Sequence, residues 1–77
     1  MLVEITLEGP LKYRRSDRRD RLCIELPQGA TVLAAIHASG VPWDEVGLAA
    51  VNGKQAEESL VLHAGDRVTL MAPLAGG

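Results

Sequence analysis

The sequence predicts a small α+β domain, a mixed sheet of four to five strands packed on one short helix, in the order ββαβββ. Two observations predict this class. Apolar residues recur at every second position in several short segments, which is typical of half-buried strands. Between them, one segment changes to helical spacing and is bracketed by residues that start and stop helices. A chain of 77 residues has room for one such domain.

The first two predicted strands are residues 1–8 and 22–26. Alternation in the first places Val3, Ile5 and Leu7 on its inner face. Alternation in the second strand places Cys23 on the outer face. The inner face carries Leu22, Ile24 and Leu26. Gly9-Pro10 ends the first strand. The charged segment Lys12–Arg21 is then predicted to be an exposed connection.

The predicted helix begins after Thr31, whose hydroxyl can accept a hydrogen bond from a free backbone N–H. Gly40 supplies a left-handed stop, and Pro42 prevents the helix from continuing. So short a helix is marginal in water by itself. We therefore expect packing of Leu33 and Ile36 onto the sheet to hold it. The following residues, 43–46, are predicted to form a connector.

The second half of the chain predicts three further strands. Residues 47–52 form the first, and Asn52-Gly53 is a strong hairpin signal. Residues 55–62 are predicted to be a loop and a short strand with Leu60 and Leu62 facing inward. Residues 67–72 alternate again, with inward side chains Val68, Leu70 and Ala72.

A tight turn is predicted at Gly65-Asp66, just before the last strand. We expect Asp66 to accept hydrogen bonds from local backbone N–H groups. Residues 1–72 are thus predicted to be the folded domain. Residues 73–77 begin with proline and end with two glycines, so they are predicted to be a flexible tail.

Composition narrows the classes of function. The formal net charge of −2 excludes a strongly basic binder of nucleic acid. A single cysteine, Cys23, rules out an intramolecular disulfide, and no apolar run approaches the length of a membrane span. We therefore expect a cytoplasmic protein without a membrane partner. His37 and His63 are too isolated to suggest a metal site. The sequence also shows no nucleophilic residue with a matching base, so we do not expect an enzyme.

Four local patterns resemble the β-grasp, ubiquitin-like sulfur carriers of the ThiS/MoaD type. They are the turn at residues 27–31 into the helix, Val51-Asn52-Gly53 after it, the stretch Leu62–Val68 with its Gly-Asp turn, and Gly76-Gly77. The resemblance covers nearly the whole chain and implies the β-grasp fold.

The resemblance also implies a function: a protein co-substrate, or the small subunit of a synthase, with no bound cofactor. A ubiquitin-activating-enzyme-like adenylyltransferase would use ATP to adenylate the Gly77 carboxylate. A sulfur donor would convert it to a thiocarboxylate for a sulfur-accepting synthase. The residues that thread into the partner would be Pro73, Leu74, Ala75 and Gly76. Molybdopterin or tungstopterin synthesis is favoured as the pathway, with thiamin synthesis or tRNA thiolation as alternatives.

The partner interface is expected on the outward face of the last strand, at Thr69 and Met71. A second candidate surface is the basic run, which includes Arg14, Arg15 and Arg18. That run is either a solvated loop or a contact for an acidic partner or phosphate, including tRNA bound to a thiolating system. Two other functions stay open: a ubiquitin-like modifier joined through Gly77 to lysines, and a non-covalent binding module that uses the arginine-rich loop.

Overall fold

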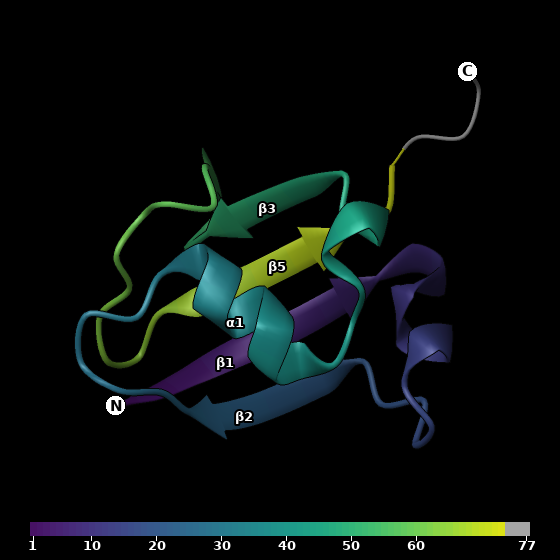
Figure 1. Cartoon of the computed structure of the whole chain (residues 1–77), viewed down its shortest axis with the longest axis horizontal. Coiled ribbons are helices and arrows are strands. Elements are labelled where there is room, and N and C mark those ends of the chain that lie inside the picture. Colours follow the sequence, from purple (N-terminus) through teal and green to yellow (C-terminus); the bar gives the residue numbers. More distant parts are fainter. Residues whose placement is uncertain (74–77) are drawn as a thin grey trace.

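The computed structural model of the chain describes residues 1–73. A helix, α1 (Val32–Ser39), lies across one face of a five-stranded sheet (Figure 1). Two 3₁₀ helices, Gly9–Arg14 and Trp43–Glu45, lie at one end of that sheet. The strands are β1 (Leu2–Glu8), β2 (Arg21–Glu25), β3 (Leu48–Val51), β4 (Lys54–Ala56) and β5 (Arg67–Met71). The predicted α+β class and the order ββαβββ are confirmed.

The last strand lies in the middle of the sheet, whose order is β2-β1-β5-β3-β4. β5 runs parallel to β1 and antiparallel to β3, and the remaining pairs are antiparallel. The register places Ile5 beside Val68 and Leu7 beside Leu70, so the buried side chains of the two central strands share one face. Because β1 and β5 are parallel, both end at the same end of the molecule, where the chain leaves the sheet.

The helix begins and ends as predicted and Ile36 is buried as predicted, but Leu33 is not part of the buried face. The Thr31 hydroxyl accepts from the Ala34 N–H at 3.4 Å, and Gly40 adopts φ 81°. With the first turn starting at Val32, helical spacing directs Val32, Ala35 and Ile36 toward the sheet. Leu33 lies about 100° further round and is only half-buried, so its predicted packing role is wrong and Val32 takes it.

The segment after β4 also departs from its prediction. Leu62 is buried, but Leu60 is 44% exposed, so the prediction that both face inward is wrong. This segment does not run as a strand of the sheet. It crosses the start of α1 through backbone hydrogen bonds from Val32 N–H to Leu60 O (3.0 Å) and from Leu62 N–H to Ala30 O (2.8 Å). Its side chains therefore do not alternate between a core face and a solvent face.

The basic connection is more ordered than predicted. Its start belongs to the 3₁₀ helix Gly9–Arg14, in which Leu11 is only 2% exposed and closes one end of the core. A single apolar residue among charged ones has no periodicity, so the sequence did not signal this helix. Within Lys12–Arg21 the predicted exposure holds at every residue except Lys12 and Arg15, which are half-buried, but the segment begins in a 3₁₀ helix and not in a loop.

The two predicted turns meet in space. Asn52 (φ 52°) and Gly53 (φ 85°) close the β3–β4 hairpin, as predicted. Asp66 accepts hydrogen bonds from the His63 N–H (2.8 Å) and the Asn52 amide (2.9 Å), and these bonds lower its pKa. Asn52 also accepts from the Arg67 N–H at 2.9 Å. The side chain of one turn thus bridges to the other and holds the start of β5.

Candidate functional site

The chain leaves the sheet at the end of β5. Met71 and Ala72 are half-buried, Ala72 packs against the core, and Pro73 is exposed. Of the predicted threading residues, only Pro73 belongs to the described part of the chain. The predicted activated residue Gly77 lies outside the described residues, as do Leu74, Ala75 and Gly76. We call residues 71–73 the tail root. The candidate site therefore consists of the tail root and the surface around it.

Gly47 determines how the tail root lies against β3. Its N–H donates to the Met71 carbonyl at 2.8 Å. A Cβ atom at this position would lie 2.5 Å from the Pro73 Cα and 2.6 Å from the Pro73 N. Both distances are shorter than atoms tolerate, so only glycine admits the backbone of Pro73 here. Sequence reasoning treated Gly47 only as the start of a strand. The available signal was an isolated glycine beside an apolar strand, which often marks the close approach of another backbone.

The two 3₁₀ helices flank the tail root (Figure 1). A groove of about 290 Å³ lies between them, lined by Pro10, Leu11, Arg14, Asp44, Glu45, Ala72 and Pro73. Arg14 and Glu45 form an ion pair that links the two helices. Arg14 was predicted as a partner contact, but here it joins two segments of its own chain beside the point where the tail departs.

Among residues 1–73, no helix covers the face of the sheet opposite α1 (Figure 1), and we call this face the open face. Thr69 and Met71 point toward it, since they alternate with the buried Val68 and Leu70. The pairing of Leu48 with Met71 adds a second apolar side chain, 36% exposed, at the same end. The outward direction of Thr69 and Met71 agrees with the sequence. The contribution of Leu48 depends on strand pairing and was missed.

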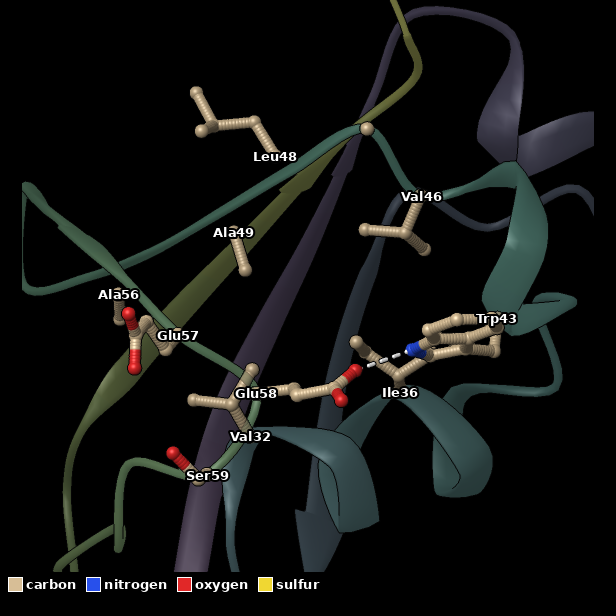
Figure 2. Close-up of a pocket in the computed structure, with 11 residues that line it drawn as sticks. Val32, Ile36, Trp43, Val46, Leu48, Ala49, Ala56, Glu57, Glu58 and Ser59 are labelled. Atoms are coloured by element: carbon tan, nitrogen blue, oxygen red, sulfur yellow. Dashed lines mark hydrogen bonds between the residues drawn. The ribbon is translucent and has the colours of Figure 1, made fainter.

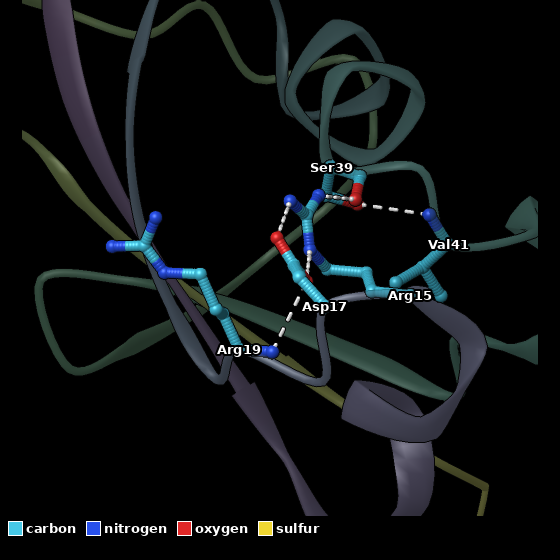
Figure 3. A network of polar contacts seen from close by, with 5 residues as sticks. All are labelled: Arg15, Asp17, Arg19, Ser39 and Val41. Carbon is cyan, nitrogen blue, oxygen red and sulfur yellow. Dashed lines mark hydrogen bonds and ion pairs between the residues drawn. The ribbon is translucent and has the colours of Figure 1, made fainter.

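Arg15 has a structural role within the basic run. Its guanidinium donates to both carboxylate oxygens of Asp17 at 2.9 and 2.8 Å, and to the carbonyl of Ser39 at 2.6 Å (Figure 3). That carbonyl is in the last turn of α1, where no N–H within the helix can pair with it. Arg15 therefore ties the basic segment to the end of the helix, a role that sequence reasoning did not assign.

The ion pair changes the ionisation of both partners. Hydrogen bonds from Arg15 and from the Arg19 N–H lower the pKa of Asp17 to about 2, and the Asp17 carboxylate raises the pKa of Arg15. The bond from the Arg19 N–H is 3.1 Å long and holds the backbone beyond Arg18, which has φ 55°. Arg18 itself is exposed, with its guanidinium 5.4 Å from the centre of the Tyr13 ring.

A larger hollow, of about 470 Å³, lies on the helix side of the sheet (Figure 2). Val32 and Ile36 of α1 form part of its wall, and Gly47 and Leu48 form its border with the tail root. Trp43, 53% exposed, donates from its indole N–H to Glu58 at 2.5 Å. The predicted connector 43–46 thus places an exposed aromatic ring on the wall of this hollow.

Other candidates stand apart from the tail root. Cys23 is exposed on β2, as predicted, and His37 and His63 are exposed as well. Within residues 1–73, no group of three or more His, Cys, Asp or Glu side chains is arranged to hold a metal ion. The same part of the chain contains no helix that is long and apolar enough to cross a membrane.

The fold and the tail root define a class: a ubiquitin-like β-grasp protein of the sulfur-carrier or modifier type, related to ThiS and MoaD. More particularly, the chain belongs to the Mut7-C ubiquitin family, whose model matches residues 6–74. It is similar to the protein RnfH of Pseudomonas fluorescens, with 39% identity over an aligned length of 81 residues, gaps included. The match covers 95% of this chain and 78% of that protein.

Two solved structures show the likeness in three dimensions. SAMP1, the small archaeal modifier protein 1 of Haloferax volcanii, superposes with a TM-score of 0.78 at 22% identity over the whole of both chains. A complex of subunits 1 and 2 of the molybdopterin-converting factor from Helicobacter pylori contains a chain that matches with a TM-score of 0.66 at 26% identity, again over the whole of both chains.

Proposed function

We propose that this chain is a sulfur carrier, a protein co-substrate whose Gly77 carboxylate is activated by a partner enzyme. The observation that supports this proposal most is the tail root. Gly47 holds the backbone of Pro73 at the end of the central strand, beside the half-buried side chain of Met71 and the exposed side chain of Leu48. Gly77 follows four residues later in the sequence.

The proposed chemistry begins with a carboxylate, which is a poor electrophile. An adenylyltransferase joins the Gly77 carboxylate to the AMP part of ATP and releases pyrophosphate. Sulfide then attacks the acyl carbon and displaces AMP, which leaves a thiocarboxylate; with a persulfide donor, a second thiol must reduce the acyl disulfide. Glycine suits this step because it has no Cβ to shield the acyl carbon.

In this scheme the partner binds the folded domain, while the C-terminal residues enter the partner's active site. Residues 73–77 span at most about 16–18 Å when extended, which lets the carboxylate enter a partner's nucleotide pocket while the sheet stays outside. The restricted φ of Pro73 lowers the entropy lost on threading. Met71 and Leu48, with Thr69 beside them, are positioned to contact the surface around that pocket.

We propose molybdopterin or tungstopterin synthesis as the pathway. The similar chain from Helicobacter pylori is bound to a second subunit of a molybdopterin-converting factor. By analogy, this chain would be the small subunit that presents its thiocarboxylate to a sulfur-accepting synthase. Synthesis of thiamin and thiolation of tRNA use the same carrier chemistry and are the alternatives.

Intact mass spectrometry tests the proposal. The 77-residue protein is incubated with ATP, sulfide and the adenylyltransferase of its own host. Exchange of one oxygen for sulfur adds about 16 Da, which we expect at Gly77. The matched control is Gly77→Val, which keeps the carboxylate but shields the acyl carbon and should react more slowly. If neither an adenylate nor a thiocarboxylate forms on the unmodified chain, the proposal is wrong.

The second candidate is a protein modifier, suggested by the likeness to the small archaeal modifier protein 1. The same activated carboxylate would then form an isopeptide with lysines of other proteins. Conjugates of higher mass in cells, lost in a variant without Gly76 and Gly77, would favour this candidate. Thiocarboxylate without conjugates would favour the carrier.

A further inference from the structure

A second hollow, of about 360 Å³, lies on the open face over β1 and β2, away from the tail root. Arg19, Arg21 and Arg67 line it together with Glu4, Thr6 and Cys23. These three arginines come from three separate places: the segment before β2, β2 itself and the start of β5. The sequence gives no hint that Arg67 joins the basic run, because the two are far apart along the chain.

Strand pairing brings these side chains together. Arg21 pairs with Thr6, while Glu4 pairs with Cys23 on one side and Arg67 on the other. Paired residues on neighbouring strands share a face and lie about 5 Å apart. All of them therefore stand on the open face within one or two strand spacings of each other.

Arg19 reaches the hollow because its backbone is held. Its N–H donates to Asp17, which is itself fixed by Arg15 at the end of α1. Figure 3 shows the Arg19 side chain extending away from this network. The network thus uses Arg15 to position Arg19, and a pre-positioned guanidinium loses less entropy when it binds a ligand.

The hollow carries unbalanced positive charge. Glu4 pairs with Arg67 at 3.1 Å, and among the described residues it is the only carboxylate that lines the hollow. Neither Arg19 nor Arg21 makes an ion pair with another side chain within residues 1–73. Since the whole chain has a net charge of −2, this positive surface is a local feature. Guanidinium groups bind carboxylates and phosphates through paired hydrogen bonds.

We propose that this hollow is an anion-binding site that receives carboxylate side chains from an acidic segment of a partner protein. The outward side chains around it favour that ligand over nucleic acid. Glu8 stands on β1 beyond the arginines, so a polyphosphate chain that extended in that direction would meet a carboxylate. In the other direction stands Glu25 of β2, which is paired with the Met1 ammonium at 2.5 Å, so the basic area does not extend there as free positive charge. A short cluster of Asp or Glu fits the limited basic area.

The site also lies within range of a partner that holds the tail. Arg67 and Met71 are the two ends of β5, about 13 Å apart at the rise of a strand. A protein that covers the open face at Met71 can extend to the hollow. The proposal concerns recognition and does not depend on any reaction at Gly77.

Cys23 provides the test because it lines the hollow, is exposed and is the chain's single cysteine. Dithiobis-nitrobenzoate, which has two carboxylates, exchanges its disulfide with the Cys23 thiolate and releases one coloured thiolate. Uncharged dithiodipyridine reacts in the same way. The ratio of the two rates measures attraction of an anion to the hollow, and the inherent reactivity of the thiol cancels.

We expect the double variant Arg19→Gln/Arg21→Gln to lower this ratio about fivefold at about 0.01 M ionic strength, where screening is weak. The matched control, Arg18→Gln/Lys54→Gln, removes the same charge from outside the hollow and should leave the ratio nearly unchanged. Circular dichroism verifies that both variants fold. Equal effects of the two variants would mean that only net charge matters, and would overturn the proposal.

Competition then identifies the anion. A hexaglutamate peptide should slow the reaction of dithiobis-nitrobenzoate and shift the amide resonances of Thr6, Arg21 and Cys23, and the double variant should abolish both effects. Stronger competition by an RNA oligonucleotide of equal charge would contradict the assignment to an acidic protein segment. Stronger competition by inorganic phosphate would contradict it too, and so would the absence of competition by the peptide.

Discussion

Gly47→Ala is the substitution that tests the geometry of the tail root most directly. The backbone of Gly47 does not have a positive φ, so alanine can adopt its conformation. In open space, such a replacement stabilises a protein by about 0.4–1 kcal/mol, because alanine restricts the unfolded chain. In this structure the new Cβ would lie 2.5 Å from the Pro73 Cα and 3.1 Å from the Ala72 carbonyl carbon.

The clash reverses the expected sign. An ordinary contact needs about 3.4 Å or more, so the backbone near Pro73 must move by about 1 Å. Overpacking of this kind costs about 1–3 kcal/mol, and loss of the hydrogen bond from Gly47 to Met71 would add about 1 kcal/mol. For a chain of this size, each 1 kcal/mol lowers the melting temperature by about 4–8 °C.

The assay is urea unfolding of four chains: the parent and Gly47→Ala, each with and without residues 73–77. Removing Pro73 removes the closest clash, so Gly47→Ala should destabilise the full chain and cost less than half as much in the shortened one. This cycle isolates the coupling between Gly47 and the tail root. An equal cost in both backgrounds, or stabilisation of the full chain, would refute the reasoning.

Two further predictions concern the basic segment. Arg15→Met should lower the free energy of unfolding by about 1.5–3 kcal/mol, because it removes charged hydrogen bonds to Asp17 and to the Ser39 carbonyl. The control is Arg18→Gln at an exposed position, which should change the free energy of unfolding by no more than about 0.5 kcal/mol. Chemical denaturation measures both, and equal effects would contradict the structural role of Arg15. The second prediction concerns pH. Folding lowers the pKa of Asp17 from 3.8 to about 2. The Asp17 carboxylate therefore stabilises the fold fully above pH 3.8, and this contribution is lost as the pH falls toward 2. The difference in melting temperature between the parent and Asp17→Asn should therefore be constant from neutral pH to about pH 5 and disappear near pH 2; a difference that widens in acid would contradict it.

Much of the fold was predictable because its signals are local. Thr31 and Gly40 mark the ends of α1 by capping chemistry and by a left-handed φ, which depend on a few neighbouring residues. Asn52-Gly53 closes its hairpin for the same kind of reason. The two errors in burial arose where the local signal was ambiguous: Leu33 is apolar but lies beside the buried stripe, and Leu60 belongs to a segment outside the sheet.

Part of the candidate site was also predictable. Alternation along β5 placed Thr69 and Met71 on the outward face without knowledge of their neighbours. The density of charge in the basic run suggested one shared role for three arginines, contact with a partner. In the structure, however, the three side chains have different surroundings. Arg14 joins two 3₁₀ helices and Arg15 holds the end of α1, while Arg18 stays exposed beside Tyr13. Side-chain partners far along the chain decide such roles, and no pattern within the run reports them.

The amino-acid sequence by itself determined the class of fold, the order of its elements, the turns and the outward face of the last strand. Each follows from dihedral preference or from apolar periodicity over a few residues. Only the tertiary structure decided that β5 lies between β1 and β3, that Gly47 admits the backbone of Pro73, and that Arg67 joins Arg19 and Arg21. The physical reason is that these features depend on strand register between distant segments, which is settled only when the whole core packs together.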